Sequence, residues 1–441
     1  MNAGARLSDA AAGVALAAAP LLRRVRPDIG RVLAARRAAA AELVAWGCRR
    51  EPGPLLWLHG ASAGELLGAA ATVRVLRAGV AARSGDRPQL LVTYSSPSGQ
   101  AALQWLGPDH SGYAPLDRRR DCDRVLAVLR PGLLVFAKLD VWPGLAAAAA
   151  RAGTPTALIN GTVRDGSRRS RRAARRLFRE SYAQLEAVGA ASREDRRRLV
   201  ALGARTDRVT LTGDAAFDLA LERADRAQAD GSAAAYRSAL GGSEPATLRL
   251  VAGSTWGADE RALLDALDSL VATRRDGGPG WQLVIAPHEP TAAHVRALVA
   301  SCEARGERVV RWSRIGASRA APAGAIVVFD EVGRLAELYA VGDVAYVGGG
   351  LGGTGLHNVL EPAAAGLPVV FGPRHDRSDA RALEAAGGGL ACSPGALPDT
   401  LAGLADPRLR AHRGAAARAF IESGAGAAAL TADLLLPLWP G

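Results

Sequence analysis

Residues 54–70 read PLLWLHGASAGELLGAA, an apolar run that ends in small and polar residues and continues as an Ala/Leu-rich segment. The run at 55–59 has the length of a buried strand, and the segment after it has a helical composition. A strand, a short turn and a helix form the repeating unit of parallel α/β sheets. This stretch therefore predicts an α/β fold that begins near residue 54.

The same alternation of short apolar runs and Ala-rich segments continues along the chain. We expect strands at 55–59, 90–94, 132–137, 156–160, 187–191 and 209–212, and again at 248–253, 282–286, 308–311, 325–329, 344–347 and 368–371. A polar stretch with Gly-Gly-Ser at 241–243 interrupts this rhythm. A length of 441 residues also exceeds one ordinary core. We therefore predict a helical segment at 1–50, a doubly wound domain at 51–220, a linker at 221–245 and a second doubly wound domain with terminal helices at 246–441.

Charge and cysteine content restrict the classes of function. The formal net charge of +12 predicts attraction to polyanions, with nucleic acid, anionic lipid and phosphorylated substrates all open. The four cysteines are far apart in the sequence and indicate neither a zinc site nor a disulfide framework, which favours a reducing cytoplasm. The apolar run at 11–22 is too short to span a bilayer, although it could lie on a membrane, and it lacks the features of a secretory signal.

The loop after the first predicted strand holds the first candidate site residues. Ser62 and Glu65 have the spacing of a capping box, which alone could explain both residues. The alternative is that Glu65, at the carboxyl end of a parallel strand, takes a proton from an acceptor hydroxyl. His59 could hydrogen-bond a substrate or be a satisfied structural histidine, and Gly64 would let the backbone approach a substrate closely.

Two further strand-end loops in the first half carry polar residues. The hydroxyl-rich turn at 94–99 contains Ser96, and it could bind an anion with its free N–H groups or simply cap a helix. Lys138 is the only lysine of the sequence and ends an apolar strand, where a charge is costly, so we treat it as a site candidate. Lys138 and Asp140 alternate onto one face of the strand end, either as a ligand-facing corner or as a structural ion pair.

The densest motif lies in the second half, where residues 348–362 read GGGLGGTGLHNVLEP. Glycines let the main chain approach a phosphate or base, Asn358 could start a helix, and Glu361 could accept both hydroxyls of a ribose. A mobile glycine loop followed by a helix cap is the structural alternative. The loops GSTW at 253–256, PHEP at 287–290 and DEVGRL at 330–335 also follow predicted strands.

The sequence lacks the motifs of two common classes of nucleotide-binding enzyme. It contains no G-x-x-x-x-G-K-[ST] sequence, and no G-x-G-x-x-G opens the first strand–helix unit, so neither a P-loop ATPase nor a standard dinucleotide enzyme is indicated. Eight arginines lie between residues 164 and 179. They could form a solvated face or contact an anionic membrane or phosphorylated lipid, and the scarcity of interleaved aromatic residues argues against nucleic acid.

Taken in order, the chain's motifs resemble those of the Kdo (3-deoxy-D-manno-octulosonate) transferases of lipopolysaccharide assembly. The motifs are HGASAGE, YSSPSG, AKLDVWP, INGTVRDGS, LTGDAAFD, GSTW, PHEP and the block at 348–373. The resemblance implies a GT-B fold, with two Rossmann-like domains facing across a cleft, the acceptor domain at 51–220 and the CMP-Kdo domain at 246–441. It implies inverting transfer of Kdo from CMP-Kdo to a lipid A precursor of the lipid IVA type, with no metal. It also implies peripheral association with the anionic cytoplasmic face of the bacterial inner membrane, with no nucleic acid partner.

The resemblance also carries the site residues over by their motifs. It places the general base at Glu65, and Lys138 is added as a catalytic candidate. The residues expected to bind the donor are Ser254, Pro287, His288, Val332, Gly333, Arg334, Gly355, Asn358, Val359, Leu360 and Glu361. The residues expected to bind the acceptor are His59, Ser62, Gly64, Ser96 and Asp140. The commoner family pattern has glutamates where Lys138, Asp140 and Arg334 stand, so the chain resembles a divergent branch.

Two other functions remain open at this point. One is a different GT-B glycosyltransferase, or a nucleotide-sugar epimerase, that uses the same loops for another donor. The other is a non-catalytic basic adaptor on membrane or RNA, which would depend on the arginine run alone. Donor nucleotide binding separates the adaptor from the enzymes.

Overall fold

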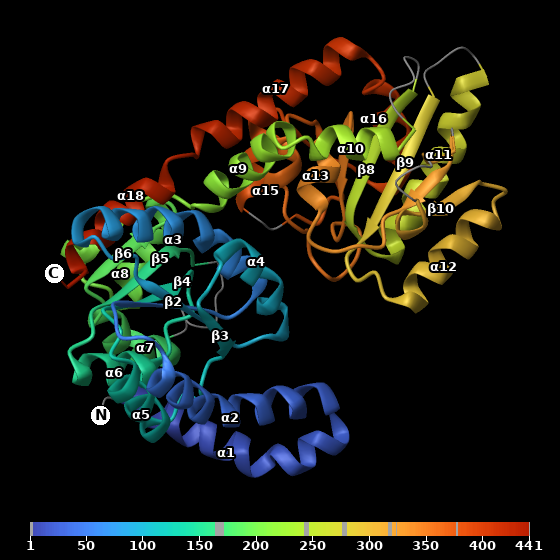
Figure 1. Ribbon diagram of the computed structural model, residues 1–441. Coiled ribbons are helices and arrows are strands. Elements are labelled where there is room, and N and C mark those ends of the chain that lie inside the picture. The colour runs from blue at the N-terminus through green and yellow to red at the C-terminus, as the bar shows by residue number, and fades with distance from the viewer. Residues whose placement is uncertain are drawn as a thin grey trace. The chain divides into compact units, whose positions relative to one another are not determined.

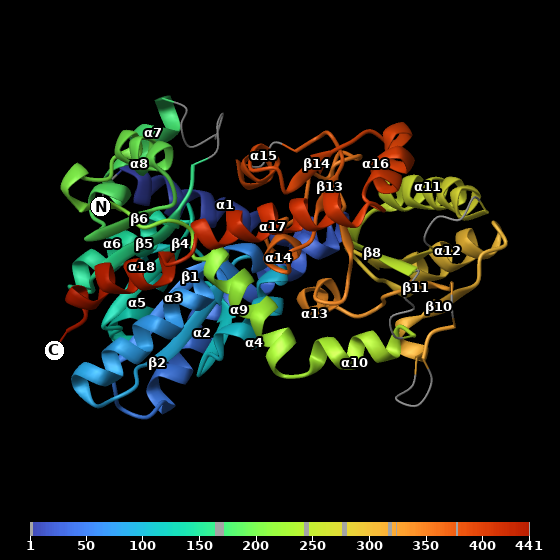
Figure 2. The same ribbon diagram turned by 90° about the horizontal axis from the view of Figure 1, so that it is seen from above.

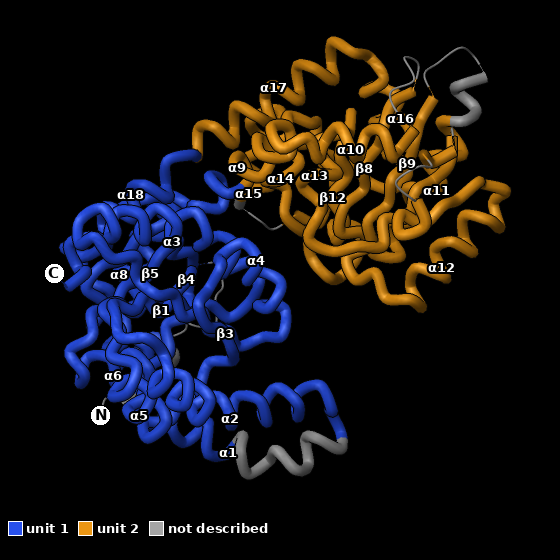
Figure 3. The backbone as a smooth tube through the Cα atoms, viewed as in Figure 1, with its two compact units in different colours: residues 1–219, 425–441 blue, residues 220–424 orange. Residues whose placement is uncertain are grey.

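The computed structural model describes residues 3–163, 172–241, 247–275, 280–315, 320–322, 324–375 and 378–440. The chain divides into two compact units (Figure 3). Unit 1 comprises Met1–Leu219 and Ala425–Gly441, and unit 2 comprises Ala220–Gly424. Each unit is built on a seven-stranded parallel sheet with helices on both faces (Figures 1 and 2). The doubly wound α/β architecture predicted from the sequence is confirmed in both halves.

The sheet of unit 1 has the strand order β3-β2-β1-β4-β5-β6-β7. Its strands are β1 (Leu55–Gly60), β2 (Gln89–Tyr94), β3 (His110–Tyr113), β4 (Leu133–Ala137), β5 (Thr156–Gly161), β6 (Ala187–Ala190) and β7 (Val209–Leu211). Its helices are α1 (Ala3–Val25), α2 (Pro27–Arg49), α3 (Ala63–Ser84), α4 (Leu103–Leu106), α5 (Arg119–Leu129), α6 (Pro143–Ala152), α7 (Arg172–Ala183), α8 (Arg193–Leu202) and α18 (Ala427–Leu435), with a 3₁₀ turn, η1 (Pro97–Ala102), before α4.

The side chains of each strand point alternately to the two faces of this sheet, and a hydrophobic core covers each face. Leu55 and Trp57 of β1 face one cluster, which contains residues from α2, α5, α6 and α8. Leu56 and Leu58 face the other cluster, which contains residues from α3 and α18. Because side chains of a strand point alternately to opposite faces, a strand covered on both sides must be apolar throughout. This explains why residues 55–58 form an unbroken apolar run.

The sheet of unit 2 has the strand order β10-β11-β9-β8-β12-β13-β14. Its strands are β8 (Thr247–Thr255), β9 (Gly280–Pro287), β10 (Val309–Arg311), β11 (Ile326–Val328), β12 (Val344–Val347), β13 (Val369–Phe371) and β14 (Gly389–Ala391). Its helices are α10 (Ser232–Ala239), α11 (Gly257–Arg275), α12 (Ala292–Glu303), α13 (Leu335–Tyr339), α14 (Leu360–Ala364), α15 (Ser378–Ala385), α16 (Leu397–Gly403) and α17 (Pro407–Ser423), preceded by α9 (Ala216–Ala229), which begins in unit 1.

The segment expected to be a linker, 221–245, is helical over most of its described length. Residues of α9 are buried at 219–220, 223–224 and 227, a spacing that gives the helix one buried face. The unit boundary at 219/220 lies next to the expected position of 220. We expected the second domain to extend to residue 441. The last helix, α18, instead belongs to unit 1, where its Ala432 and Leu435 pack in the core beside α3.

The strand order of each sheet marks a point where ligands bind in such folds. The first strand of each unit lies between neighbours that continue in opposite directions: β1 between β2 and β4, and β8 between β9 and β12. Ligands of doubly wound domains bind beyond the carboxyl ends of the strands at this switch point. The loops after β1 and β4 in unit 1, and after β8 and β12 in unit 2, are therefore the ones to examine.

The segment Pro407–Leu438 has the length and hydropathy of a membrane span within the described part of the chain. It consists of α17 and α18 with a break at 424–426, followed by a short 3₁₀ turn. Its residues Ala417 and Ile421 are fully buried, as are Ala432 and Leu435. Core helices of soluble proteins pass the same length and composition test, so the segment is weak support for a membrane span.

Candidate active site

Glu65 lies in the first turn of α3, directly after β1. One of its carboxylate oxygens accepts a hydrogen bond from the Ala61 backbone N–H at 2.5 Å. Ser62 is the N-cap residue of α3, but its side chain makes no capping hydrogen bond. The reciprocal capping box that the spacing suggested is therefore not formed. The carboxylate instead lies folded against the strand-to-helix turn, half-buried at the carboxyl edge of the sheet.

The surroundings of Glu65 favour a stronger base than an ordinary carboxylate. Burial raises the pKa of Glu65 above its usual value, and the Asp140 carboxylate raises it further. The hydrogen bond from Ala61 and the charges of Lys138 and His59 act on the pKa in the opposite direction. A carboxylate with a raised pKa is better suited to accept a proton in the transition state. The net shift of the Glu65 pKa is therefore in the direction that suits a general base.

His59 lies beneath this edge and supports Asp140. Its ring has no exposed surface, and its two nitrogens lie 3.0 Å from Thr93 Oγ1 and 3.2 Å from Asp140 Oδ2. The Trp142 indole N–H also donates to Asp140 Oδ2, at 2.8 Å. An ionised Asp140 can only accept, so the histidine donates to it from Nε2. His59 thus orients Asp140 and does not itself face solvent.

Lys138 is placed at the end of β4 in a strained backbone conformation. Its φ angle is +56°, and Asn160, at the end of the neighbouring strand β5, has a φ of +51°. Left-handed conformations of non-glycine residues are uncommon and cluster at functional sites. The Lys138 ammonium lies 3.9 Å from the Asp214 carboxylate, and its side chain is 29% exposed. The lone lysine is therefore at the carboxyl edge, where the sequence placed it, with Asp214 as an ion-pair partner.

The other predicted acceptor residues surround the same loop. Gly64 is exposed, and a Cβ on it would meet no atom within 4 Å. Ser96 caps η1, because its side chain accepts from the Ser98 N–H, and its own N–H donates to Ala61 O at 2.8 Å. The structure thus joins the loops after β1 and β2. Ser96 has the helix-cap role that was weighed against anion binding.

The glycine loop after β12 in unit 2 has two halves with different surroundings. A Cβ on Gly348 would lie 2.3 Å from Ser254 O, and one on Gly350 would lie 2.8 Å from Gly372 N. In the second half, a Cβ on Gly353 or Gly355 would meet nothing within 4 Å. The first half therefore needs glycine to pack against neighbouring backbone, whereas only the second half has the open space that a ligand would need.

Asp259 fixes this loop and was not identified from the sequence. It is fully buried in the first turn of α11 and accepts hydrogen bonds from Trp256 N at 3.0 Å, Gly349 N at 2.9 Å and the Tyr346 hydroxyl at 2.9 Å. A buried carboxylate needs such donors, and each bond ties a different element to the helix. In the sequence, an acidic residue three positions after Trp256 looks like an ordinary helix start. Its hydrogen bonds to Tyr346 and Gly349 are long-range and could not be predicted from the local sequence.

Three rings lie together after β8, β9 and β12. His288 stacks on His357 with ring centroids 4.0 Å apart, and Trp256 donates from its indole N–H to His357 Nε2 at 2.8 Å. Burial against these rings lowers the pKa of His288, and the neighbouring Glu289 raises it. His288 is exposed and so remains accessible to a ligand. Pro287 ends β9 just before it, and Ser254 adopts a φ of +54° at the end of β8.

Glu361 is held by an arginine that the sequence reading did not connect with it. Arg223 of α9 donates from Nη1 to Glu361 Oε1 and from Nη2 to Gly333 O at 3.3 Å. The Glu361 side chain is 14% exposed. Asn358 Oδ1 accepts from the Leu360 N–H at 3.1 Å, just before α14, whose N-cap residue is Val359.

The remaining predicted donor residues lie on the same two loops. Val332 is 73% exposed, and Gly333 has a φ of +81°. Arg334 is exposed and lies 3.5 Å from Glu337 Oε1. Val359 and Leu360, in contrast, are buried in the core, so any ligand contact there would come from their backbone.

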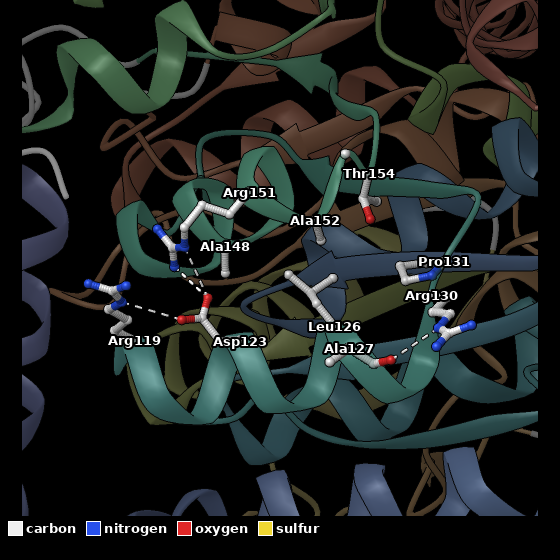
Figure 4. Close-up of a pocket in the computed structure, with 11 residues that line it drawn as sticks. Arg119, Asp123, Leu126, Ala127, Arg130, Pro131, Ala148, Arg151, Ala152 and Thr154 are labelled. Atoms are coloured by element: carbon white, nitrogen blue, oxygen red, sulfur yellow. Dashed lines mark hydrogen bonds and ion pairs between the residues drawn. The ribbon is translucent and has the colours of Figure 1, made fainter.

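A pocket of about 610 Å³ lies at the opposite edge of the unit 1 sheet, between α5 and α6 (Figure 4). Pro131 and Thr154, just before β4 and β5, line it. Asp123 points toward Arg119 and Arg151, at 3.4 and 2.5 Å. Because the carboxyl ends of the strands lie at the other edge, this pocket is separate from the candidate site.

Among the residues that the structure describes, no group of three or more His, Cys, Asp and Glu side chains is placed to hold a metal ion. Four of the eight arginines of the predicted basic run lie outside the described residues. Arg175, Arg176 and Arg179, on α7, are described and exposed. They are consistent with a solvated basic face.

Two Rossmann-like domains, one with titratable side chains and one with a glycine-lined loop at the switch point, have the architecture of the GT-B class. The fold is similar to that of the UDP-GlcNAc 2-epimerase from Neisseria meningitidis bound to UDP-GlcNAc, with a TM-score of 0.59 and 13% identity. The match covers 87% of this chain and 100% of that one. At this identity the likeness concerns the fold alone.

Sequence relatives decide the family. A sequence model described as 3-deoxy-D-manno-octulosonic-acid transferase (kdotransferase) matches residues 45–219. The chain is 30% identical to the 3-deoxy-D-manno-octulosonic acid transferase of Bordetella pertussis, over 88% of both chains. It is 28% identical to that of Chlamydia pneumoniae, over 73% of this chain and 70% of the relative. The chain belongs to the Kdo transferase family and is a glycosyltransferase that transfers Kdo in lipopolysaccharide biosynthesis.

Proposed function

We propose that this enzyme takes Kdo from CMP-Kdo and transfers it, with inversion, to a hydroxyl of a lipid A precursor of the lipid IVA type. The observation that carries the proposal is the environment of Glu65 at the end of β1, where burial and the Asp140 carboxylate raise its pKa. Family membership supplies the sugar. The acceptor and the activated donor are part of the proposal.

In the proposed reaction, Glu65 removes the proton of the acceptor hydroxyl as its oxygen attacks the anomeric carbon of Kdo. The bond from that carbon to the phosphate oxygen breaks, and CMP leaves with the bonding electron pair. Lys138 contributes a positive charge that favours the ionised form of Glu65 at rest. The Asp140 carboxylate, oriented by His59, raises the pKa of Glu65 and so makes it a stronger base.

Unit 2 is proposed to hold the donor. Its candidate contacts are the exposed residues of the loops after β9, β11 and β12, which are His288, Val332, Arg334, Gly355 and Asn358. Glu361 would accept from the ribose hydroxyls with its second carboxylate oxygen, Oε2, since Arg223 Nη1 donates to Oε1. We propose no metal, with the phosphate charge met by His288, Arg334 and backbone N–H groups.

We also propose peripheral association with an anionic membrane surface. Leu7 and Val14 of α1 are more than half exposed, and Val25 and Ile29 add apolar surface at the turn into α2. The exposed arginines of α7 would add electrostatic attraction. The proposed location is the cytoplasmic face of the inner membrane, where a lipid acceptor would be reached.

The first experiment measures CMP release from CMP-Kdo in the presence of a lipid A precursor. Glu65→Gln should lower kcat by about 100- to 10,000-fold, because the general base is lost while the shape of the side chain is kept. Glu186→Gln, which changes an exposed glutamate of the same unit, serves as the matched control. Full activity of Glu65→Gln would end the role assigned to Glu65.

A second experiment addresses the donor. The likeness to a UDP-GlcNAc 2-epimerase makes UDP-GlcNAc the informative competitor. Titration of the full chain with CMP and with UDP-GlcNAc should give binding of CMP only. Tighter binding of UDP-GlcNAc would favour the alternative of a transferase or epimerase with a different donor, and binding of neither would favour the non-catalytic adaptor.

A further inference from the structure

Arg223 is a buried charge on a helix that carries none of the predicted ligand contacts. It lies on α9, within the segment expected to be a linker, and its side chain is 6% exposed. A guanidinium cannot give up its proton in a protein, so its burial is tolerated only where acceptors and negative charges surround it. Glu361 and Glu337 supply that charge, the second at 3.9 Å.

The hydrogen bonds of Arg223 join the two loops assigned to the donor. Nη1 donates to the Glu361 carboxylate at the start of α14, and Nη2 donates to the carbonyl of Gly333 before α13. These two acceptors lie on segments that follow different strands, β12 and β11. The planar fork of an arginine can serve two acceptors at a fixed angle, which the single ammonium of a lysine cannot do.

Other contacts make α9 the support for both short helices (Figure 2). Gln228 donates to Ala340 O at 3.2 Å, at the end of α13. Arg418 of α17 donates to Ala364 O at 2.7 Å, at the end of α14, and also to Asp225 at 3.0 Å. α9 therefore bonds directly to both ends of the α13 segment and to the start of α14, and through Arg418 to the end of α14.

We propose that Arg223 is a positioning residue for the donor nucleotide, which fixes the Glu361 carboxylate and the loop at 332–334 in one arrangement before the nucleotide binds. This inference rests on the proposed function, because it assumes that those two loops bind CMP. A preorganised carboxylate does not have to lose freedom when the ribose arrives, so affinity increases without a direct contact from Arg223 to the ligand. In this proposal Arg223 affects the affinity for the nucleotide and does not affect the proton transfer at Glu65.

The test measures CMP affinity of the full chain by calorimetry, together with the thermal midpoint. Arg223→Gln should weaken CMP binding by about 10- to 100-fold, because Glu361 loses its buried counter-charge and the 333 loop loses its anchor. Arg223→Lys should give an intermediate loss, since it keeps the charge but not the fork. Arg226→Gln is the matched control, because Arg226 lies on the same helix with a side chain that is 67% exposed, and it should bind CMP as the wild type does.

A double-mutant cycle separates positioning from general support of the fold. If Arg223 acts in part through Glu361, Arg223→Gln should weaken CMP binding by a smaller factor in the Glu361→Gln background than in the wild type, and the loss that remains would belong to the 332–334 loop. Fully additive losses, or a lowered thermal midpoint with unchanged CMP affinity, would overturn the inference. Should Arg223→Gln not fold, Arg223→Lys decides, and wild-type affinity in that variant would overturn it as well. Failure of the wild type itself to bind CMP would count against the proposed function, which distinguishes the two.

Discussion

The carboxyl edges of the two sheets use different means to present polar groups. In unit 1 the ionisable side chains belong to residues at or just after the strand ends, such as Lys138 after β4, Asp214 after β7 and Glu65 after β1. In unit 2 the loop after β12 is largely glycine, and its ionic contacts come from helices, with Arg223 on α9 and Asp259 on α11.

This difference separates two tasks that the same fold can perform. Short, strained strand ends hold charges close together, so that the charges of Asp140 and Lys138 act on the pKa of Glu65. A glycine loop anchored from behind offers backbone N–H groups and open space, which suits binding of a nucleotide. These features fit the roles proposed above, so we call the strand ends of unit 1 the proposed reacting site and the loops after β11 and β12 in unit 2 the proposed holding site.

The largest expected effect tests the packed half of the glycine loop. Gly348→Ala should destabilise the protein by about 3 kcal/mol or more, because its Cβ would lie 2.3 Å from Ser254 O and 2.6 Å from Thr255 Cα, and backbone cannot yield as a side chain can. The measurement is urea unfolding followed by circular dichroism. Gly353→Ala, with no neighbour within 4 Å, should stay within about 0.5 kcal/mol of the wild type. Equal stability of the two variants would contradict the division of the loop into two halves.

A second prediction concerns the anchor of that loop. Asp259→Asn should lower the free energy of unfolding by about 2 kcal/mol, because an amide NH₂ group replaces one of the two carboxylate oxygens. One of these oxygens accepts from Trp256 N and Gly349 N, and the other accepts from the Tyr346 hydroxyl. Asp265→Asn, on the same helix with a side chain 67% exposed, is the control for loss of a charge. The free energies of unfolding of both variants decide the matter. A loss no larger than that of the control would mean that the loop does not depend on Asp259.

A third prediction tests the proposed reacting site through the pH dependence of kcat/KM. Glu65 must be ionised to accept a proton, so kcat/KM should fall as the pH drops through its pKa, which burial places above the ordinary value for a carboxyl group. Lys138→Met removes a charge that lowers this pKa and should move the acidic limb of the profile to higher pH. Asp140→Asn removes a charge that raises the pKa and should move the limb to lower pH.

The opposite signs of these two shifts are the check on the assignment. Asp123→Asn, at the other edge of the same sheet, should leave the acidic limb where it is in the wild type. If the Lys138 and Asp140 variants moved the limb in the same direction, another group would be titrating and Glu65 would not be the base.

The sequence predicted the central strands and two of the four edge strands, β7 and β10, and it missed the other two edge strands. The strands absent from the prediction, β3 and β14, are the outermost strands of their sheets. β3 reads HSGY and is half-buried throughout, and β14 has only three residues. An edge strand has fewer covering neighbours and so does not need the continuous apolar run that marks a buried one.

Candidate site residues could be selected from the sequence where the signal is local. Lys138 directly follows a strand, Glu65 lies in the first turn of the helix after β1, and Asn358 follows a glycine-rich loop, so each belongs to a motif that the sequence displays. The family resemblance, and not spacing alone, gave Glu65 its predicted role as a base. Arg223 lies 138 residues before its partner Glu361, in an Ala-rich stretch that suggested a linker. No local pattern distinguishes a buried arginine from the many exposed ones in so basic a chain. The contacts that fix the holding site therefore came only from the tertiary structure.

The smallest expected effect compares two buried tyrosines near the holding site. Tyr339 and Tyr346 are each 1% exposed, but only the Tyr346 hydroxyl has a hydrogen-bond partner among the described residues, namely Asp259. Tyr346→Phe should therefore cost about 1 to 2 kcal/mol, because it leaves a buried carboxylate short of a donor, whereas Tyr339→Phe should be neutral or slightly stabilising. Paired urea unfolding of the two variants measures this. The Tyr339 hydroxyl occupies the space where a side chain at Gly253 would lie, so equal losses would mean that it has a polar contact there that supports the loop after β8.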